Sequence, residues 1–286
     1  MRTLAAALLA LAAATLHAQS DPVSRSWNQP VEPFRIIANV YYVGASDIAS
    51  YLIATPKGHI VIDGGFVETE PMILRSIEKL GFDPHEVRII LNSHAHYDHA
   101  GGISALRDYT GANFIASEGD APMLARGGKD DPQFGDRYPY PGIEPDQLLR
   151  EADRVSLGGS MLTAHITPGH TKGCTTFSMK ARQKGKIYDI VFICSTSAPD
   201  GYRLTANPRY PDAVDDYRRT FATLRALPVD VFLGAHGSIF GLAEKMQRIG
   251  KGGNPFIDPE GYKRYLDASQ KQFEAKVAAQ SGPPSQ

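Results

Sequence analysis

Three histidines and one aspartate, His94, His96, Asp98 and His99, lie within six consecutive residues. Imidazole nitrogen and carboxylate oxygen are ligands that zinc and other borderline metals accept. The chain has nine histidines among 286 residues, so three in so short a run are improbable by chance. We therefore interpret the run as a metal site. The alternative is a polar loop in which the histidines have no common role.

Two further histidines follow apolar segments and are flanked by small residues. His170 stands in the run PGHT and His236 in the run GAHG. A lone histidine after a strand is more often an ordinary surface residue than a ligand. Beside the first cluster, however, both are candidates to complete one site, because strands of one sheet can end at a common edge.

The elements that would position these residues form two successive sets of strands and helices. Apolar, β-rich segments predict strands, and apolar residues spaced by three or four predict helices. The predicted strands span 36–43, 51–54, 59–62, 87–91, 113–116, 154–166, 175–179, 187–193 and 229–233. The predicted helices span 68–80, 103–109, 212–227 and 262–279. This order predicts an α/β fold in which two sheets pack face to face with helices outside.

Two segments are predicted to lack regular structure. Residues 19–34 contain three prolines and little periodicity, which indicates an extended arm. Residues 127–145 are rich in Gly, Pro, Asp and Tyr, which indicates a long loop. Loops of this length in compact domains are often functional, so this loop is a candidate to line a substrate groove.

The composition is that of a folded protein with little net charge. Hydrophobic residues make up 42% of the chain, charged residues 21%, and the formal net charge is −1. These values argue against intrinsic disorder. They also provide no basic excess for binding nucleic acid. Two cysteines are too few to form a disulfide scaffold.

The first residues have the order of a secretory signal peptide. A basic start is followed by an unbroken Leu/Ala run over residues 4–14 and then by small residues. The alternative is a membrane anchor, but the run is shorter than the roughly 20 residues that a span needs. We expect residues 1–18 to be removed, which would leave an exported, periplasmic protein with no membrane segment.

The order and spacing of these motifs resemble those of the metallo-β-lactamase superfamily. The matching pattern is His-x-His-x-Asp-His-x-Gly-Gly, then Pro-Gly-His-Thr, then Gly-x-His, with Val-Ile-Asp-Gly-Gly over 61–65 before them. The resemblance covers about residues 36–245. It implies a four-layer αβ/βα sandwich, formed by a single domain of two αβ halves over residues 19–286, with a two-zinc site at one edge.

The same resemblance assigns the six candidate ligands to two ions. The first zinc would be bound by His94, His96 and His170, and the second by Asp98, His99 and His236. Asp98 would also orient a metal-bound hydroxide that attacks the substrate carbonyl. No protein nucleophile is needed in such a reaction.

The strand that ends near residue 193 distinguishes subgroups of this superfamily. Lactonases, glyoxalase II-like thioesterases and nucleases usually carry a bridging Asp after it, whereas this sequence reads CSTSAP. Together with His99, this run resembles the third subclass of true metallo-β-lactamases. The resemblance implies that Ser195 and Ser197 bind the substrate carboxylate. The alternative is that both serines are turn residues before a proline.

Cys194 has more than one possible role. A one-residue shift in strand register would point Cys194, rather than Ser195, at the metal. We favour Ser195, because six ligands are present without a thiolate. The hairpin centred near Lys184 would place Cys174 and Cys194 nearly opposite each other. Exported proteins tolerate disulfides, so we predict a cross-strand bridge, with two buried thiols as the alternative.

The resemblance therefore implies zinc-dependent hydrolysis of the β-lactam amide bond of penicillins, cephalosporins and carbapenems, and hence antibiotic resistance. The expected partner is a small-molecule β-lactam, and we expect a monomer that binds neither nucleic acid nor membrane. Two alternatives remain open. One is another exported hydrolase of the superfamily, such as a lactonase. The other is a zinc-binding protein without enzymatic activity, against which the complete set of six ligands argues.

Overall fold

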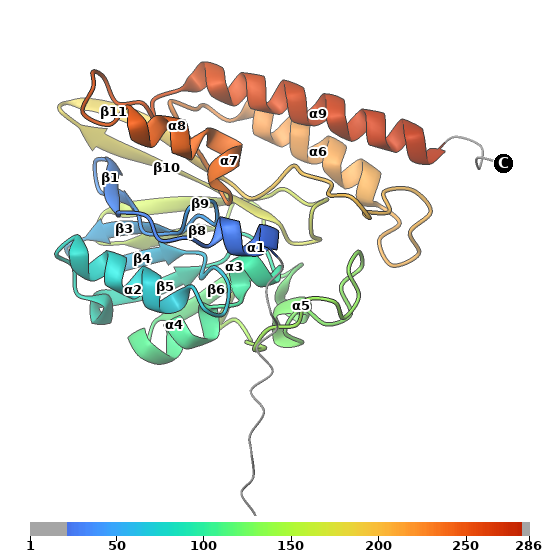
Figure 1. Ribbon diagram of the computed structural model, residues 1–286, viewed down its shortest axis with the longest axis horizontal. Coiled ribbons are helices and arrows are strands. Elements are labelled where there is room, and N and C mark those ends of the chain that lie inside the picture. The colour runs from blue at the N-terminus through green and yellow to red at the C-terminus, as the bar shows by residue number, and fades with distance from the viewer. Residues whose placement is uncertain (1–21, 282–286) are drawn as a thin grey trace, which may run out of the picture.

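Two β-sheets lie face to face in the computed structural model, which describes residues 22–281 (Figure 1). The first sheet has seven strands in chain order, antiparallel from β1 to β4 and parallel from β4 to β7. They are β1 (Phe34–Ile37), β2 (Val40–Tyr42), β3 (Tyr51–Thr55), β4 (Gly58–Ile62), β5 (Val87–Leu91), β6 (Asn113–Ser117) and β7 (Gln147–Leu149). Because β4 and β5 are parallel, the segments that follow them leave the sheet at the same edge.

The second sheet has five strands in the order β12-β11-β10-β9-β8. They are β8 (Arg154–Leu157), β9 (Ser160–Ile166), β10 (Thr175–Gln183), β11 (Lys186–Ile193) and β12 (Val231–Gly234). All neighbours are antiparallel except β11 and β12, which are parallel, with Ile193 paired to Gly234. The segments after β11 and β12 therefore also start side by side.

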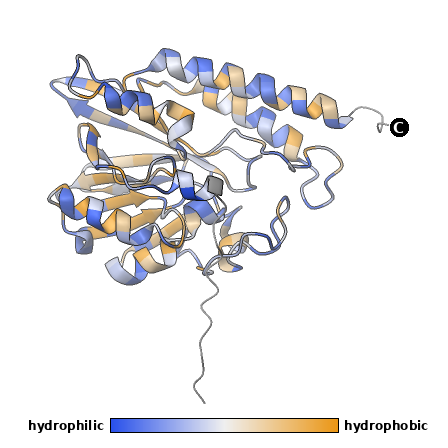
Figure 2. Cartoon of the chain, in the orientation of Figure 1, coloured by the Kyte–Doolittle hydropathy of each residue, from blue (hydrophilic) through white to orange (hydrophobic). Residues whose placement is uncertain are grey.

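Helices cover the outer face of each sheet, so the chain forms four layers (Figure 1). Figure 2 shows apolar residues concentrated on the strands and hydrophilic residues on the outward faces of the helices. The helices are α1 (Pro22–Trp27), α2 (Glu70–Lys79), the 3-10 helix η1 (Pro84–Glu86), α3 (Tyr97–Ala100), α4 (Ile103–Thr110), α5 (Ala121–Ala125), α6 (Ala213–Ala226), α7 (Gly237–Phe240), α8 (Leu242–Gln247) and α9 (Pro259–Ser281). Between residues 22 and 281, no helix is long and apolar enough to cross a membrane. The predicted α/β sandwich is confirmed.

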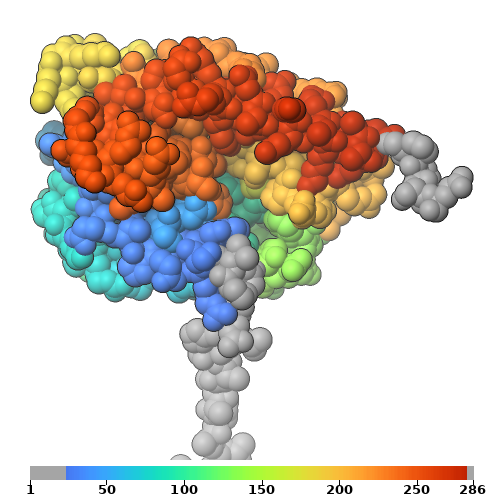
Figure 3. Space-filling model, turned by 45° about the horizontal axis from the view of Figure 1, so that its top comes forward, coloured from blue at the N-terminus to red at the C-terminus, as the bar shows by residue number. Residues whose placement is uncertain are grey.

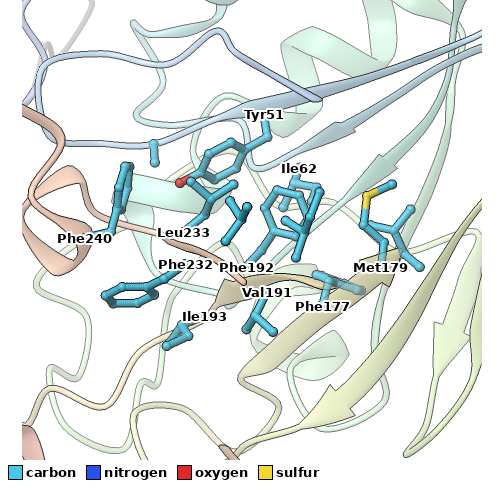
Figure 4. Close-up of a cluster of buried hydrophobic side chains, with 14 of the residues drawn as sticks. Tyr51, Ile62, Phe177, Met179, Val191, Phe192, Ile193, Phe232, Leu233 and Phe240 are labelled. Carbon is cyan, nitrogen blue, oxygen red and sulfur yellow. The ribbon is translucent and has the colours of Figure 1, made fainter. Parts of the chain in front are cut away.

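Aromatic and branched side chains of both sheets fill the space between them (Figure 4). Tyr51 of β3 packs edge to face against Phe192 of β11, with ring centroids 5.0 Å apart. Its hydroxyl donates to the carbonyl oxygen of Gly234, at the end of β12, at 2.6 Å. A buried tyrosine needs such an acceptor, so this contact fixes the first sheet against the strand end that precedes His236.

The structure differs from the sequence prediction at several short elements. Residues 22–27 form α1 rather than part of an extended arm. The carbonyl oxygen of Trp27 accepts from the backbone N–H groups of Asp47 and Ile48 at 2.9 and 3.2 Å, a contact that no local pattern predicts. The predicted strand 36–43 is a hairpin of β1 and β2. The elements β7, α3, α7 and α8 are too short to produce a periodic signal.

Candidate metal centre

The histidine cluster begins just after β5, at the edge of the first sheet. Asp63, which follows β4, fixes the start of this loop. Its Oδ1 accepts from Asn92 Nδ2 at 3.0 Å and from Ser93 N at 2.7 Å, and its Oδ2 accepts from Ser93 Oγ at 2.6 Å. Ser93 Oγ lies in turn 3.0 Å from His94 Nδ1. A neighbouring strand therefore determines how the ligand loop leaves β5.

His170 and His236 reach the same place from the second sheet, after β9 and β12. Gly169, before His170, has a φ of 128°, and a Cβ there would lie 2.7 Å from the ring of Tyr217. Glycine is therefore needed at this turn. The structure brings all six residues selected from the sequence together, in two groups of three.

The first group consists of His94, His96 and His170, whose candidate ligand atoms lie within 4.8 Å of one another. His96 Nδ1 is 3.1 Å from His170 Nε2. The outer ring nitrogens face acceptors. His170 Nδ1 lies 2.8 Å from the carbonyl oxygen of Ser197, and His96 Nε2 lies 3.3 Å from Asp131 Oδ2.

The second group consists of Asp98, His99 and His236. The two Nε2 atoms of its histidines are 3.2 Å apart, and Asp98 Oδ2 lies 3.5 Å from each of them. Behind the rings, His236 Nδ1 lies 2.8 Å from Asp47 Oδ2. His99 Nδ1 lies 3.5 Å from Asp63 Oδ2, an ionic contact longer than a good hydrogen bond.

Burial and neighbouring charges shift the pKa values of the histidines in opposite directions in the two groups. Burial, with the adjacent imidazoles, lowers the pKa of His94 and His170 well below the usual value. Burial alone would also lower the pKa of His99, but the Asp98 and Asp63 carboxylates raise it to about 10. Burial would raise the pKa of Asp98, but its histidine neighbours hold it well below the usual range. At neutral pH, His94 and His170 of the first group are therefore neutral, whereas Asp98 and His99 of the second group form a charged pair.

The donor arrangement fits a metal ion. His170 Nδ1 faces a carbonyl oxygen and must carry the proton, so Nε2 of the neutral ring is bare. The Asp131 carboxylate faces Nε2 of His96, so Nδ1 of His96 points at Nε2 of His170, 3.1 Å away. Two ring nitrogens that converge in this way, each ring backed by an acceptor on its outer side, have the arrangement of paired metal ligands. Nitrogen and carboxylate donors in sets of three suit zinc with an open position for water.

A buried aspartate that the sequence reasoning missed joins the two ligand loops. Asp120 accepts from Ala95 N at 2.9 Å, from Thr171 Oγ1 at 2.7 Å and from Gly173 N at 2.7 Å. Burial raises the pKa of this carboxyl, and the three donors partly oppose the shift. Asp120 thus ties the loop of His96 to the loop of His170, although it touches neither ring.

The 127–145 loop folds against the first group. Asp131 Oδ1 accepts from the backbone N–H groups of Gln133 and Phe134 at 2.6 and 2.8 Å, which leaves Oδ2 to face His96. Beside this loop, a cavity of about 340 Å³ reaches the first group. The sequence indicated a functional loop here but not that Asp131 would support a histidine.

The two serines lie after β11, beside the first group. Ser195 Oγ is 3.0 Å from Ser197 Oγ and accepts from Ser197 N at 3.1 Å. Ser197 Oγ lies 3.4 Å from His170 Nδ1. The pair therefore forms a compact hydroxyl cluster next to the donors.

The predicted disulfide between Cys174 and Cys194 is present, with the Cα atoms 5.8 Å apart. Its sulfur atoms approach His94, but a disulfide offers no thiolate to a metal. Phe177 pairs with Phe192, and this register offsets Cys174 and Cys194 by one residue. The hairpin predicted from the sequence placed them nearly opposite each other. Cys194 was the alternative to Ser195 as the residue that points at the metal, and its sulfur is taken up by this bridge.

Together, the fold and the site define a two-sheet α/β protein with a largely buried cluster of histidine and aspartate side chains that could hold a metal. The sequence matches the metallo-β-lactamase superfamily over residues 43–236, and the chain belongs to this superfamily, whose members depend on metal, typically zinc. It superposes on FEZ-1 metallo-β-lactamase from Legionella gormanii with a TM-score of 0.87 and 40% identity, over 89% of this chain and 99% of that one. For BJP-1, a subclass B3 metallo-β-lactamase of Bradyrhizobium japonicum, the TM-score is 0.84 and the identity 38%, over 89% and 97%. The resemblance inferred from the motifs is confirmed.

Curated relatives of the chain have other activities. The N-acyl homoserine lactonase AttM of Azorhizobium caulinodans is 27% identical over 207 residues, 62% of this chain and 75% of the lactonase. A hydroxyacylglutathione hydrolase of Rhodospirillum rubrum is 35% identical over 113 residues, 40% of this chain. The chain spans only 35% of the length of that hydrolase. The comparisons thus show the superfamily, and the activity and its substrate have to be argued from the site.

Proposed function

We propose that this chain is a zinc-dependent β-lactam hydrolase of the third metallo-β-lactamase subclass. The observation that carries the proposal is the hydroxyl pair of Ser195 and Ser197, which stands beside two complete groups of donors. The lactonases and thioesterases of this superfamily usually carry a bridging aspartate after the same strand. The similarity to FEZ-1 and BJP-1 over nearly their whole length supports the same assignment.

Six side chains would hold the metal. The proposed ligands of one zinc are His94, His96 and His170, and those of the other are Asp98, His99 and His236. Bound zinc lowers the pKa of water to about 7 and polarises a carbonyl oxygen. The chain supplies a fixed, buried frame for this chemistry, because the outer ring nitrogens of His96, His170 and His236 each face an acceptor.

The remaining roles belong to side chains that can hold a proton or bind the substrate. Asp98 stays ionised at neutral pH, since its pKa is held well below the usual range. It can accept a hydrogen bond from the attacking water and orient it. The hydroxyls of Ser195 and Ser197 can donate to the carboxylate that β-lactams carry. Neither serine acts as a nucleophile in this scheme.

A lactonase is the second candidate, favoured by the AttM relatives. A side-by-side assay of the zinc-loaded protein with a penicillin, a cephalosporin, a carbapenem and a homoserine lactone decides between them. We expect turnover of the β-lactams, loss of nitrocefin hydrolysis in excess chelator, and recovery on adding zinc. Faster hydrolysis of the lactone than of every β-lactam would replace the proposal. Undiminished turnover in excess chelator would refute the metal dependence.

The proposed activity is consistent with export to the periplasm. The predicted signal peptide, residues 1–18, lies outside the described residues. We propose that its removal leaves a periplasmic monomer of residues 19–286 that folds as a single domain. Expression in a Gram-negative host tests this, because the periplasmic protein should have the mass of the processed chain and elute as a monomer.

A further inference from the structure

The segment that carries the two serines, residues 195–212 between β11 and α6, consists of turns and irregular backbone. Tyr202 N donates to the Pro199 carbonyl oxygen at 3.1 Å, but most backbone groups of such a segment need partners elsewhere. A cavity of about 450 Å³ lies between this segment and α9. Packing against α9 is therefore incomplete, and polar contacts must fix the position of the segment.

Side chains of α9 reach across to the segment. In Figure 3, the gold-coloured residues near 200 lie beneath the red helix. Tyr265 Oη lies 2.7 Å from Thr196 Oγ1. Lys276 Nζ donates to the carbonyl oxygens of Ala198 at 2.7 Å and Pro199 at 2.5 Å. These contacts hold the residues on either side of Ser197.

Gln280 continues the same set of contacts at the end of α9. Its Oε1 accepts from Leu204 N at 2.7 Å, and its Nε2 donates to the Tyr202 carbonyl oxygen at 2.6 Å. Its own carbonyl oxygen accepts from Thr205 Oγ1 at 3.1 Å. Tyr265, Lys276 and Gln280 together supply partners along residues 196–205.

The segment held by α9 contacts the candidate metal centre at two points. The Ser197 carbonyl oxygen lies 2.8 Å from His170 Nδ1 and accepts from Tyr217 Oη at 2.6 Å. Tyr202 Oη donates to the His170 carbonyl oxygen at 3.2 Å, and its ring stacks on the His170 ring with centroids 5.6 Å apart. A displacement of the segment would therefore move the serine hydroxyls relative to this centre.

We propose that α9 is a brace that positions Ser195 and Ser197 for the substrate carboxylate, with Lys276 as its principal positioning residue. The inference rests on the proposed β-lactam hydrolysis. Lys276 bonds two consecutive carbonyl oxygens directly after the serines, and its side chain is 22% exposed. The carboxylate of Asp200, 3.6 Å away, is fully exposed, so backbone bonding rather than an ion pair defines this role.

The kinetic test compares three variants of the full-length, zinc-loaded enzyme. In Lys276→Met, we expect the KM for nitrocefin to rise about 5–10-fold with kcat within about twofold, because substrate binding is lost rather than transition-state stabilisation. Lys276→Arg keeps cationic donors and should restore most of the KM. Lys271→Met removes an exposed lysine of the same helix and should have no effect. An unchanged KM, or a fall in kcat together with zinc content, overturns the proposal.

Hydrogen exchange tests the brace without any turnover. In Lys276→Met, the amides of residues 195–205 should exchange about tenfold faster while those of β10 and β11 do not change. Gln280→Ala should give a smaller increase in the exchange rate of the same segment. This variant replaces Lys276→Met in the test if Lys276→Met folds poorly. Unchanged exchange in both variants overturns the brace. If exchange responds but the unmodified enzyme hydrolyses no β-lactam, the proposed function fails and the brace stands.

Discussion

The two groups of donors contain similar side chains in different electrostatic surroundings. The first group has three imidazoles, and a serine hydroxyl, a backbone carbonyl oxygen and the Asp131 carboxylate lie behind them. The second group has two imidazoles and the Asp98 carboxylate, with Asp47 and Asp63 behind the rings. Three carboxylates thus surround two imidazoles in the second group, against one carboxylate for three imidazoles in the first.

This difference determines how each group is prepared for a cation. Burial would lower the pKa of His236, but hydrogen bonds with Asp47 and Asp98 raise it, opposite to the lowered pKa of His94 and His170. In the first group, His94 and His170 therefore present neutral lone pairs. The second group presents negative charge that protons balance until a metal replaces them. The following predictions test this contrast.

Removing one ligand from either group should have the largest effect. His94→Ala and His236→Ala should each lower kcat/KM for nitrocefin by about 10²–10³-fold, the typical cost of losing electrostatic stabilisation in an active site. The variants should differ in which ion is lost, measured by native mass spectrometry. His85→Ala, which removes an exposed histidine, is the control. Retention of the full metal content by both variants would contradict the ligand assignment.

Removing the disulfide should mainly lower the free energy of unfolding and, to a smaller extent, weaken zinc binding by the first group of donors. The Cys174–Cys194 bridge closes a sequence separation of 20 residues, for which the chain-entropy estimate is about 3 kcal/mol. The double variant to alanine should lose about that free energy of unfolding in urea. Because the bridge approaches His94, zinc should also dissociate more easily from the first group than from the second. Equal stability of the oxidised and alanine forms would refute this role.

Changing the carboxylate behind one group should weaken zinc binding by that group and not by the other. Asp131→Asn should weaken zinc binding by the first group, and Asp47→Asn by the second, each by about 10–100-fold, because such partners orient the ligating imidazole. Competition with a chromophoric chelator measures both affinities. Asp108→Asn removes an exposed carboxylate on α4 and is the control. If both variants weakened the same site, the pairing of carboxylates with groups would be wrong.

The six candidate ligands, which the structure brings together, could be selected from the sequence because each is recognisable locally. Four share one short run, and His170 and His236 stand among small residues after apolar strands. The alternation of strands and helices likewise predicted the two-sheet fold. The supporting residues have no local sequence pattern. Asp120 accepts hydrogen bonds from backbone groups 25 and 53 residues away, and Lys276 donates to a carbonyl oxygen 78 residues away. Sequence patterns can therefore select candidate ligands, whereas the residues that would orient them are defined by tertiary contacts.

The pH dependence of zinc binding, with an expected change of about tenfold per pH unit, tests the electrostatic contrast directly. In the metal-free protein, the pKa of His99 is raised to about 10, so His99 is protonated at neutral pH and must release its proton to bind zinc. The affinity of the second group should therefore increase about tenfold per pH unit between about pH 6 and pH 9. His94 and His170 should add little to the pH dependence of the first group, because their pKa values lie well below the usual value and these rings are already neutral. Calorimetric titration in buffers of different ionisation enthalpy counts the protons released at each step, and equal release at both steps would contradict the contrast.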